Sequence, residues 1–167
     1  MTESERADRA YGVFQTIARG YDAANERISL GRQRRWKRAA IDGLRLKNTG
    51  RGLDLGCGTG DMLELLAERY PGMELVGLDF SPNMLQVAKE RLAGFANVSL
   101  EQGDAMHLGY ADGSFDCVVS AFALRNMASC ERAVGEIARV LKPGGVVCCM
   151  DSFVPECRAL LPLYRLY

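Results

Sequence analysis

The stretch Leu53-Asp54-Leu55-Gly56-Cys57-Gly58-Thr59-Gly60-Asp61 decides the fold of this chain. Its apolar start predicts a strand, its alternating glycines predict a tight loop, and Asp61 begins a helical pattern. A strand, a glycine loop and a helix N-terminus in this order form a common cradle for a nucleotide-like ligand, because glycine lets a ligand approach the backbone closely.

The spacing of the glycines indicates which ligand binds. A dinucleotide site reads G-x-G-x-x-G and places a pyrophosphate at the helix N-terminus. Here the third glycine comes one residue early, and Asp54 and Asp61 flank the loop. Two acids would repel a pyrophosphate but would attract a sulfonium and an α-ammonium group. The loop therefore predicts S-adenosylmethionine; a nicotinamide dinucleotide and a purely structural turn are the alternatives.

Two further acids follow predicted strands. Asp79 ends the apolar run 74–79, about twenty residues past the glycines, where an acid accepts hydrogen bonds from both hydroxyls of a ribose; a helix cap is the alternative. Asp104 follows the strand Val98-Ser99-Leu100 and is a candidate acceptor for an adenine amino group.

The rest of the chain alternates between strand and helix patterns. We predict helices over 5–20, 34–44, 61–70, 82–93 and 130–141, and strands over 52–55, 74–79, 97–101, 115–121 and 145–151. Alternation of apolar strands with helices is typical of an α/β fold, with an open, mainly parallel sheet covered by helices on both faces.

The composition fits one domain without metal or nucleic-acid chemistry. The chain has 167 residues, with 21 basic and 21 acidic side chains, so no nucleic-acid partner is indicated. No apolar run reaches the length of a membrane span, and the charged N-terminus does not resemble a signal peptide. Six cysteines without a C-x-x-C pair, and a single histidine, His107, predict buried apolar cysteines in a reducing compartment and no metal site.

Three motifs carry a resemblance to a known family. They are YDAANERISLG at residues 21–31 (with Trp36 beyond), FALRN at residues 122–126 and RVLKPGG at residues 139–145. With them the chain resembles the class I S-adenosylmethionine-dependent methyltransferases, and among these the C-methyltransferases of ubiquinone and menaquinone biosynthesis. It departs from the family pattern at Ala24, Gln33 and Ala121, where the family usually has a methionine, a histidine and a small hydroxyl residue or glycine.

The resemblance implies a Rossmann-like fold in a single domain. We expect a helical lid over 1–48, a cofactor-binding core over 49–154, and the start of a truncated C-terminal part over 155–167. The final β-hairpin of the methyltransferase fold is absent from this sequence, so the chain is expected to be incomplete or to depend on a partner. A non-enzymatic cofactor-binding module is one alternative, and a class I methyltransferase with another small-molecule acceptor is a second.

The same resemblance and the loop chemistry together define the candidate site. The expected cofactor-binding residues are Tyr21, Asp54, Gly56, Gly58, Thr59, Gly60, Asp79, Phe80, Asp104, Ala105 and Ala121. Tyr21 and Asn25 are interpreted as a lid over the cofactor, with simple helix packing as the alternative.

The implied reaction requires an activated ring carbon. A carbon of a quinol or naphthol accepts a methyl group when a neighbouring phenolic hydroxyl loses its proton. We therefore expect Arg125 to stabilise the phenolate, since a fixed cation lowers the pKa of a phenol, and Asn126 to orient the hydroxyl. A surface salt bridge is the alternative for Arg125.

Two features predict partners. The segment 32–38 places five basic residues around Trp36, which is typical of a solvated helix face or of docking on an anionic membrane; nucleic-acid binding is a third interpretation. A lipid-like quinol substrate would fit a cytoplasmic protein at the inner face of the membrane. The apolar fifth strand, around 146–150, would be an exposed sheet edge, which predicts a homo-oligomer covering it.

Overall fold

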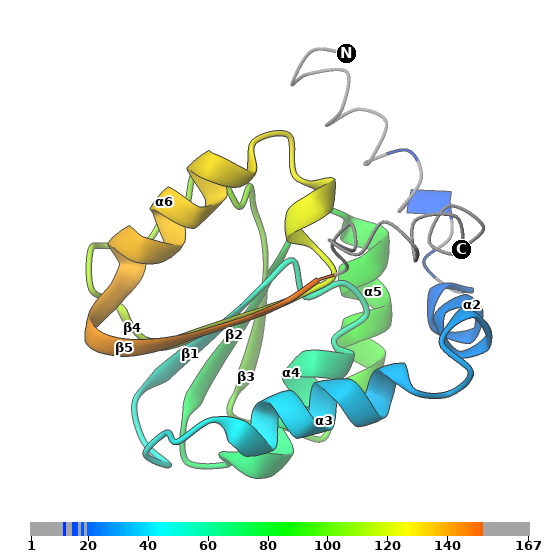
Figure 1. Cartoon of the computed structure of the whole chain (residues 1–167), viewed down its shortest axis with the longest axis horizontal. Helices are drawn as coiled ribbons and strands as arrows, with labels where there is room; N and C mark the ends of the chain where they lie inside the picture. The colour runs from blue at the N-terminus through cyan, green and yellow to red at the C-terminus, as the bar shows by residue number, and fades with distance from the viewer. Residues whose placement is uncertain (1–11, 13–14, 17, 19, 152–167) are drawn as a thin grey trace, which may run out of the picture.

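The computed structural model describes residues 20–151 together with Gly12, Gln15, Thr16 and Ala18 (Figure 1). Most of the helix expected over 5–20, and the whole of the segment 155–167, lie outside the described residues. The expected α/β architecture is confirmed.

A parallel sheet forms the centre of the molecule. Its strands are β1 (Arg51–Leu55), β2 (Glu74–Asp79), β3 (Val98–Gln102), β4 (Phe115–Ala121) and β5 (Leu141–Met150), in the order β3-β2-β1-β4-β5. All four strand pairs are parallel. The order reverses direction between β1 and β4, and ligands of open α/β sheets bind at the carboxyl ends of the strands beside such a point.

Helices cover both faces of this sheet (Figure 1). The described helices are α2 (Tyr21–Ile28), α3 (Gln33–Gly43), α4 (Asp61–Arg69), α5 (Pro82–Arg91), α6 (Cys130–Val140) and the short 3₁₀ turn η1 (Leu124–Asn126). Alternate strand residues point to opposite faces. Leu75, Cys117 and Val119 therefore pack with α4, whereas Leu53, Val76 and Val118 pack with α6.

Local sequence signals explain where the helices begin. The side chain of Ser81 accepts a hydrogen bond from the backbone N–H of Met84, with Pro82 at the first helical position of α5. Ser129 caps α6 in the same way through the N–H of Arg132. Both residues satisfy backbone donors that the first turn of a helix leaves unpaired.

Two expectations are corrected at the end of the chain. Helix α6 ends at Val140, and β5 begins at Leu141 instead of Gly145. The reason is that Leu141 already pairs with Phe115, after which the register shifts before Cys117 meets Val146. The intervening Lys-Pro-Gly-Gly segment, with Gly144 at φ 77°, thus lies within the strand as an irregularity.

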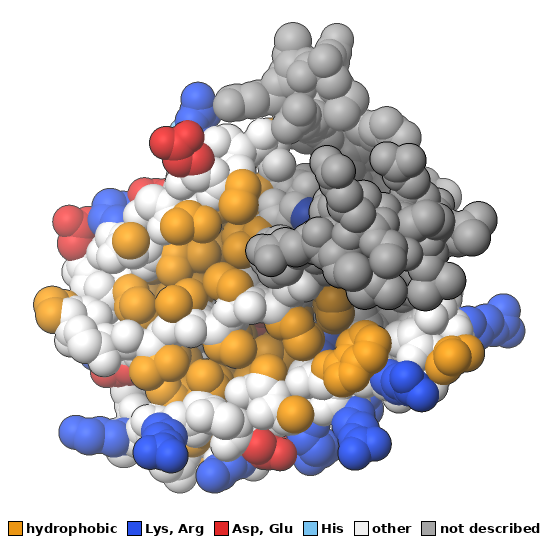
Figure 2. All heavy atoms as spheres, viewed as in Figure 1, with side chains coloured by type: hydrophobic (Ala, Val, Ile, Leu, Met, Phe, Trp, Pro, Cys, Tyr) orange, Lys and Arg blue, Asp and Glu red, His pale blue; other side chains and the backbone are white. Residues whose placement is uncertain are grey.

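The cysteines also depart from expectation. Cys57 and Cys117 are buried, but Cys130 and Cys149 are exposed. Cys149 is exposed because β5 lies at the end of the strand order among the described residues. On the face in Figure 2, hydrophobic side chains gather where β5 runs between α6 and α3, and Val147 of this strand is 50% exposed.

None of the helices in the described part of the chain is long and apolar enough to cross a bilayer.

Candidate cofactor site

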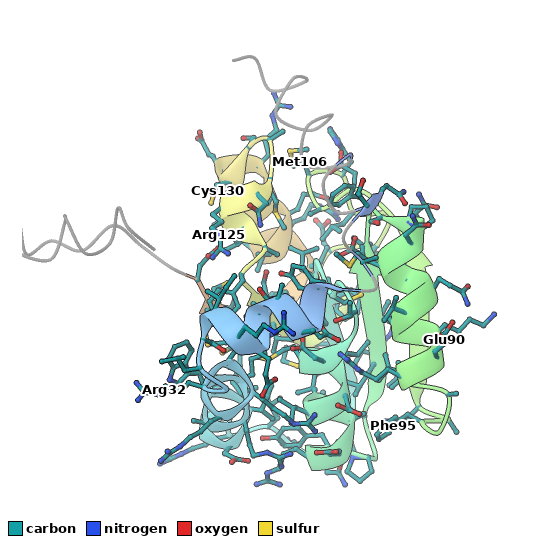
Figure 3. The ribbon with its side chains drawn as sticks, turned by 90° about the vertical axis from the view of Figure 1, so that its right-hand side faces the viewer. Arg32, Glu90, Phe95, Met106, Arg125 and Cys130 are labelled. Carbon is teal, nitrogen blue, oxygen red and sulfur yellow. The ribbon has the colours of Figure 1, made fainter. Side chains whose placement is uncertain are left out.

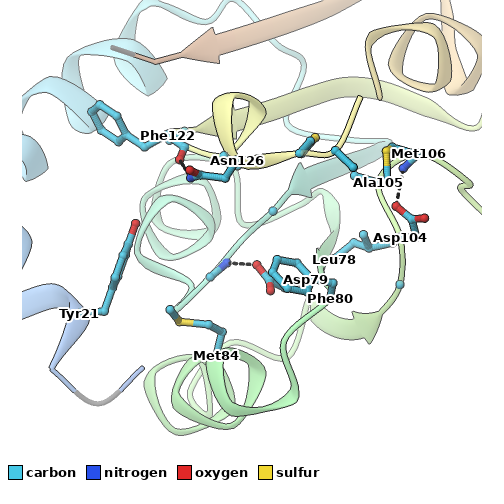
Figure 4. Close-up of a pocket in the computed structure, with 17 residues that line it drawn as sticks. Tyr21, Leu78, Asp79, Phe80, Met84, Asp104, Ala105, Met106, Phe122 and Asn126 are labelled. Carbon is cyan, nitrogen blue, oxygen red and sulfur yellow. Dashed lines mark hydrogen bonds between the residues drawn. The ribbon is translucent and has the colours of Figure 1, made fainter. Parts of the chain in front are cut away.

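A cavity of about 400 Å³ opens at the carboxyl ends of β1, β2 and β4 (Figure 4). Eight of the predicted cofactor-binding residues line it: Tyr21, Gly56, Gly58, Asp79, Phe80, Asp104, Ala105 and Ala121. Asp54, Thr59 and Gly60 do not. Of the two predicted catalytic residues, Asn126 lines the cavity and Arg125 does not.

The glycine loop combines open and crowded positions. Gly56, Gly58 and Gly60 all have positive φ, at 72°, 54° and 82°, which favours glycine strongly. A Cβ on Gly56 would lie 2.6 Å from the Cβ of Ala123, and one on Gly60 would lie 2.8 Å from Leu92. A Cβ on Gly58 would meet nothing within 4 Å. The backbone at Gly58 is therefore the part of the loop that a ligand can approach.

Asp79 is held in place by the backbone of two neighbouring loops. Its Oδ2 accepts a hydrogen bond from the Gly58 N–H at 2.8 Å, and its Oδ1 accepts one from the Ser81 N–H at 2.9 Å. Burial raises the pKa of Asp79 above its usual value, although the N–H groups of Ser81, Gly58 and Phe80 act in the opposite direction.

This geometry fits the ribose of S-adenosylmethionine. An ionised carboxylate offers about four acceptor sites, so its contacts with backbone N–H groups leave capacity to accept a further hydrogen bond. Two fixed acceptors on one carboxylate, in a cavity wall beside an open glycine backbone, match a vicinal diol. The chemistry of the residues present is thus compatible with the cofactor that the loop predicts.

Asp104 lies at the other end of the cavity, near Ala105 and Met106 (Figure 4). Its Oδ1 accepts from the Met106 N–H at 2.9 Å, and its Oδ2 lies 3.1 Å from Nδ1 of His107. The carboxylate is therefore oriented by its own loop. Together with Leu78 and Phe80, it bounds a largely apolar end of the cavity that can take an aromatic base.

The two acids that flank the loop lie in different surroundings. Asp54 is 1% exposed, and neither of its oxygens has a hydrogen-bond partner among the described residues. Burial, and next the charge of Asp61, raise the pKa of Asp54 to about 8. Asp61 is bound by the buried Lys37, whose Nζ donates to both carboxylate oxygens at 2.7 and 2.6 Å. The attraction of both acids to a sulfonium and an α-ammonium group stays a prediction; the structure adds that Asp54 is buried and that Asp61 is paired with Lys37.

Thr59 faces away from the cavity and contacts helix α2. It is 2% exposed, and its Oγ1 donates to Oδ1 of Asp22 at 2.7 Å. Arg91 of α5 reaches the same two residues. A cofactor contact by the Thr59 side chain is not part of this geometry.

Asn126 and Arg125 sit on η1, directly after β4. The Asn126 Nδ2 donates to the carbonyl of Phe122 at 3.1 Å, which directs the amide oxygen away from that carbonyl. Phe122 has φ 57°, a rare conformation for an aromatic residue. The Arg125 guanidinium pairs with Oδ1 of Asp151 at 2.5 Å. The Arg125 side chain is 43% exposed but that of Asp151 only 3%, so this ion pair differs from the surface salt bridge that was the alternative for Arg125.

Tyr21 closes the side of the cavity opposite Asp79 (Figure 4). Burial raises the pKa of its hydroxyl, and a side-chain hydrogen bond with Asn25 partly offsets this rise. The charge of Arg125 also lowers the pKa of Tyr21, so this cation acts at the cavity although it does not line it.

Two residues that contact the glycine loop were not predicted from the sequence to do so. Lys37 was assigned to a solvated basic cluster, yet it is 4% exposed. Asp22 belongs to the quoted Tyr-Asp motif, but nothing in the sequence connects it with Arg91. No group of three or more His, Cys, Asp or Glu side chains is placed to hold a metal ion in the part of the chain that is described.

Comparisons with known proteins identify the family of the chain. The chain matches the ubiE/COQ5 methyltransferase family over residues 1–167. It is 39% identical to demethylmenaquinone methyltransferase of Staphylococcus aureus over 161 residues, covering 96% of this chain and 67% of the relative.

Solved structures of other proteins share the fold. The YcgJ protein of Bacillus subtilis is 30% identical with a TM-score of 0.67, over 74% of this chain and 53% of that one. Phosphoethanolamine N-methyltransferase 1 of Haemonchus contortus, solved with phosphoethanolamine and S-adenosylhomocysteine, has a TM-score of 0.76 over 93% of this chain and 34% of that one. At 22% identity, the second likeness shows the fold alone. The chain spans about two thirds of the length of the Staphylococcus relative, and with its fold and its full-length match it belongs to the ubiE/COQ5 family of S-adenosylmethionine-dependent methyltransferases.

Proposed function

We propose that this protein uses S-adenosylmethionine to methylate a ring carbon of a prenylated quinol or naphthol, a precursor of menaquinone or ubiquinone. The observation that carries the proposal is the Asp79 carboxylate, fixed by the N–H groups of Gly58 and Ser81 in the wall of a cavity that also contains Asn126. The 39% identity to a demethylmenaquinone methyltransferase supports the acceptor class.

The cofactor is held by residues of the core. Asp79 accepts hydrogen bonds from the two ribose hydroxyls, the open backbone at Gly58 lies against the ligand, and the apolar end at Phe80 and Asp104 takes the adenine. When bound, S-adenosylmethionine supplies an electrophilic methyl group. Tyr21 excludes water from the opposite side of the cavity.

The acceptor is positioned from η1. Since the Asn126 Nδ2 is engaged by the Phe122 carbonyl, the amide oxygen is the group that receives the hydrogen bond of a phenolic hydroxyl. Arg125 lies next in sequence and supplies the positive charge that favours the phenolate. Asp151 balances this charge in the structure, so the phenolate competes with Asp151 for the guanidinium. Proximity and orientation account for much of the remaining acceleration.

The experiment combines cofactor binding with product analysis. S-Adenosylhomocysteine should bind the purified chain, and methyl-labelled S-adenosylmethionine should label a prenylated naphthol presented in vesicles. Asn126→Ala and Arg125→Ala should each lower the turnover rate about 100-fold and leave the affinity for S-adenosylhomocysteine within about twofold.

Asn97→Ala is the matched control, because the Asn97 amide only donates to the Met73 carbonyl, in the loop before β2. Label in a water-soluble product would favour another class I methyltransferase. Binding without any transfer would favour a cofactor-binding module that needs a partner.

We also propose that the turn between α2 and α3 rests on an anionic membrane surface. Ile28, Leu30 and Trp36 are 53%, 80% and 46% exposed around this turn. Arg32, at the surface in Figure 3, and Arg35 lie beside them. The other three cations of the segment are paired within the protein: Lys37 with Asp61, Arg34 with Glu64 and Arg38 with Glu68. Exposed apolar side chains next to cations are typical of lipid headgroup contacts.

Vesicle sedimentation tests this contact. The protein should bind phosphatidylglycerol vesicles more strongly than phosphatidylcholine vesicles, and Leu30→Ser with Trp36→Ala should abolish most of the binding. Equal sedimentation of the wild type and this double variant would refute it.

A further inference from the structure

Three side chains from distant parts of the chain meet beneath helix α2. Asp22, on α2, accepts a hydrogen bond from Thr59 in the glycine loop at 2.7 Å. Arg91, on α5, pairs with the second carboxylate oxygen of Asp22 through its Nη2 and donates to the Thr59 Oγ1 at 3.3 Å through its Nη1. Each member contacts both others, so the cluster joins α2, the loop and α5 at one point.

Within the described part of the chain, helix α2 buries little apolar surface. None of its eight residues is fully buried, whereas α4 alone buries five. Elements with few buried apolar contacts open at low free energy. The position of α2 therefore depends strongly on the polar contacts of Asp22.

The residue next to Asp22 faces the cavity. Tyr21 lines it, opposite Asp79 (Figure 4). Because Tyr21 and Asp22 are consecutive on a short helix, a shift that separates Asp22 from Thr59 must also move Tyr21. The cluster and the cavity wall are mechanically coupled.

We propose that Asp22, Thr59 and Arg91 form a latch that holds Tyr21 over the cofactor and thereby sets the rate at which the cofactor leaves. The three are positioning residues, since they act through Tyr21 and none of them lines the cavity. The proposal rests on the proposed function only in that S-adenosylmethionine occupies this cavity.

The test measures binding and dissociation of S-adenosylhomocysteine by calorimetry and stopped-flow fluorescence. Arg91→Gln should weaken affinity about tenfold and raise the dissociation rate by a similar factor. Asp22→Asn removes the negative charge of the latch with a side chain of the same shape. It should weaken affinity and raise the dissociation rate to a similar extent. Thr59→Ser keeps the hydroxyl, so S-adenosylhomocysteine should dissociate from this variant at nearly the wild-type rate.

Arg69→Gln is the matched control. It makes the same substitution in an exposed ion pair between α4 and α3, with Asp42 at 4.0 Å, and contacts no residue of the latch or cavity. It should leave affinity and dissociation unchanged.

Two measurements separate a latch from a general structural role. In the Tyr21→Ala background, Arg91→Gln should have no further effect on dissociation, because contacts that act through one residue are not additive. Amide hydrogen exchange over residues 21–28 of the ligand-free protein should be faster in Arg91→Gln, while exchange in β1 and β2 stays unchanged.

The outcomes distinguish this proposal from the function on which it rests. A wild-type chain that does not bind S-adenosylhomocysteine would overturn both. A wild type that binds, with Arg91→Gln and Asp22→Asn dissociating at the control rate, would overturn the latch alone. Additive effects of Arg91→Gln and Tyr21→Ala would also overturn it.

Discussion

The backbone N–H of Gly58 donates a hydrogen bond to Oδ2 of Asp79 at 2.8 Å, so the glycine loop after β1 and the acid that ends β2 form one structural unit. The parallel register of β1 and β2, with Leu55 opposite Leu78, brings the two together. This hydrogen bond fixes the position of the loop backbone and the orientation of the Asp79 carboxylate together. A substitution at either Gly58 or Asp79 should therefore change the affinity for the same ligand.

Asp79→Asn should weaken S-adenosylhomocysteine binding about 10- to 100-fold. The amide keeps the shape of the acid, but its NH₂ group must face the N–H of either Gly58 or Ser81, and one acceptor for a ribose hydroxyl is lost. Calorimetry measures the affinity. Asp112→Asn is the control, since that side chain is 81% exposed and pairs only at the surface with Arg139. Equal affinities for the two variants would exclude the ribose contact.

Two neighbouring glycines should respond differently to alanine. Gly56→Ala places a Cβ 2.6 Å from that of Ala123 at φ 72°, so it should lower the free energy of unfolding by about 1–3 kcal/mol. Gly58→Ala at φ 54° should cost only about 1–2 kcal/mol, but its methyl group projects into open space beside the ligand and should weaken binding. Urea denaturation and calorimetry test both variants. A Gly58→Ala chain with unchanged affinity would show that the ligand does not approach this backbone.

Stability should fall with rising pH because of Asp54. Its pKa is about 8 in the folded chain and near its ordinary value of 3.8 when unfolded, so the folded state holds the proton more tightly. The stabilisation is complete below about pH 4 and is lost as the pH rises toward 8.

Asp54→Asn removes this titration. The difference in unfolding free energy between the variant and the wild type should shift in favour of the variant by about 3 kcal/mol between pH 5 and pH 8. Urea denaturation at the two pH values measures it, and parallel pH profiles for the two proteins would contradict the raised pKa.

Lys37→Met should destabilise the fold by about 3 kcal/mol, because it removes the buried member of an ion pair and leaves the partly buried Asp61 without its cation. The Lys37 side chain is 5% exposed, in contrast to Arg38, which is 52% exposed in its pair with Glu68. Arg38→Met should therefore cost less than about 1 kcal/mol. Thermal and urea denaturation compare the two substitutions, and equal costs would show that burial of Lys37 adds nothing.

The sequence predicted much of the fold because the relevant signals are local. Glycine permits the positive φ found at Gly56, Gly58 and Gly60, and the apolar run of β2 can be read directly from residues 74–79. The predicted strands over 74–79 and 115–121 have the same bounds in the structure. The start of β5 was misplaced by four residues because the pairing of Leu141 with Phe115 is a contact between distant segments.

Residue types and their spacing along the chain determined the parallel sheet, the glycine loop and the candidate ribose acid. Only the tertiary structure decided the charge states and partners around them. Lys37 lies 24 positions from Asp61, Asp22 lies 69 from Arg91, and Arg125 lies 26 from Asp151. Whether a carboxylate is ionised or a cation paired depends on burial and on distance in space, and packing sets both after the local elements have formed.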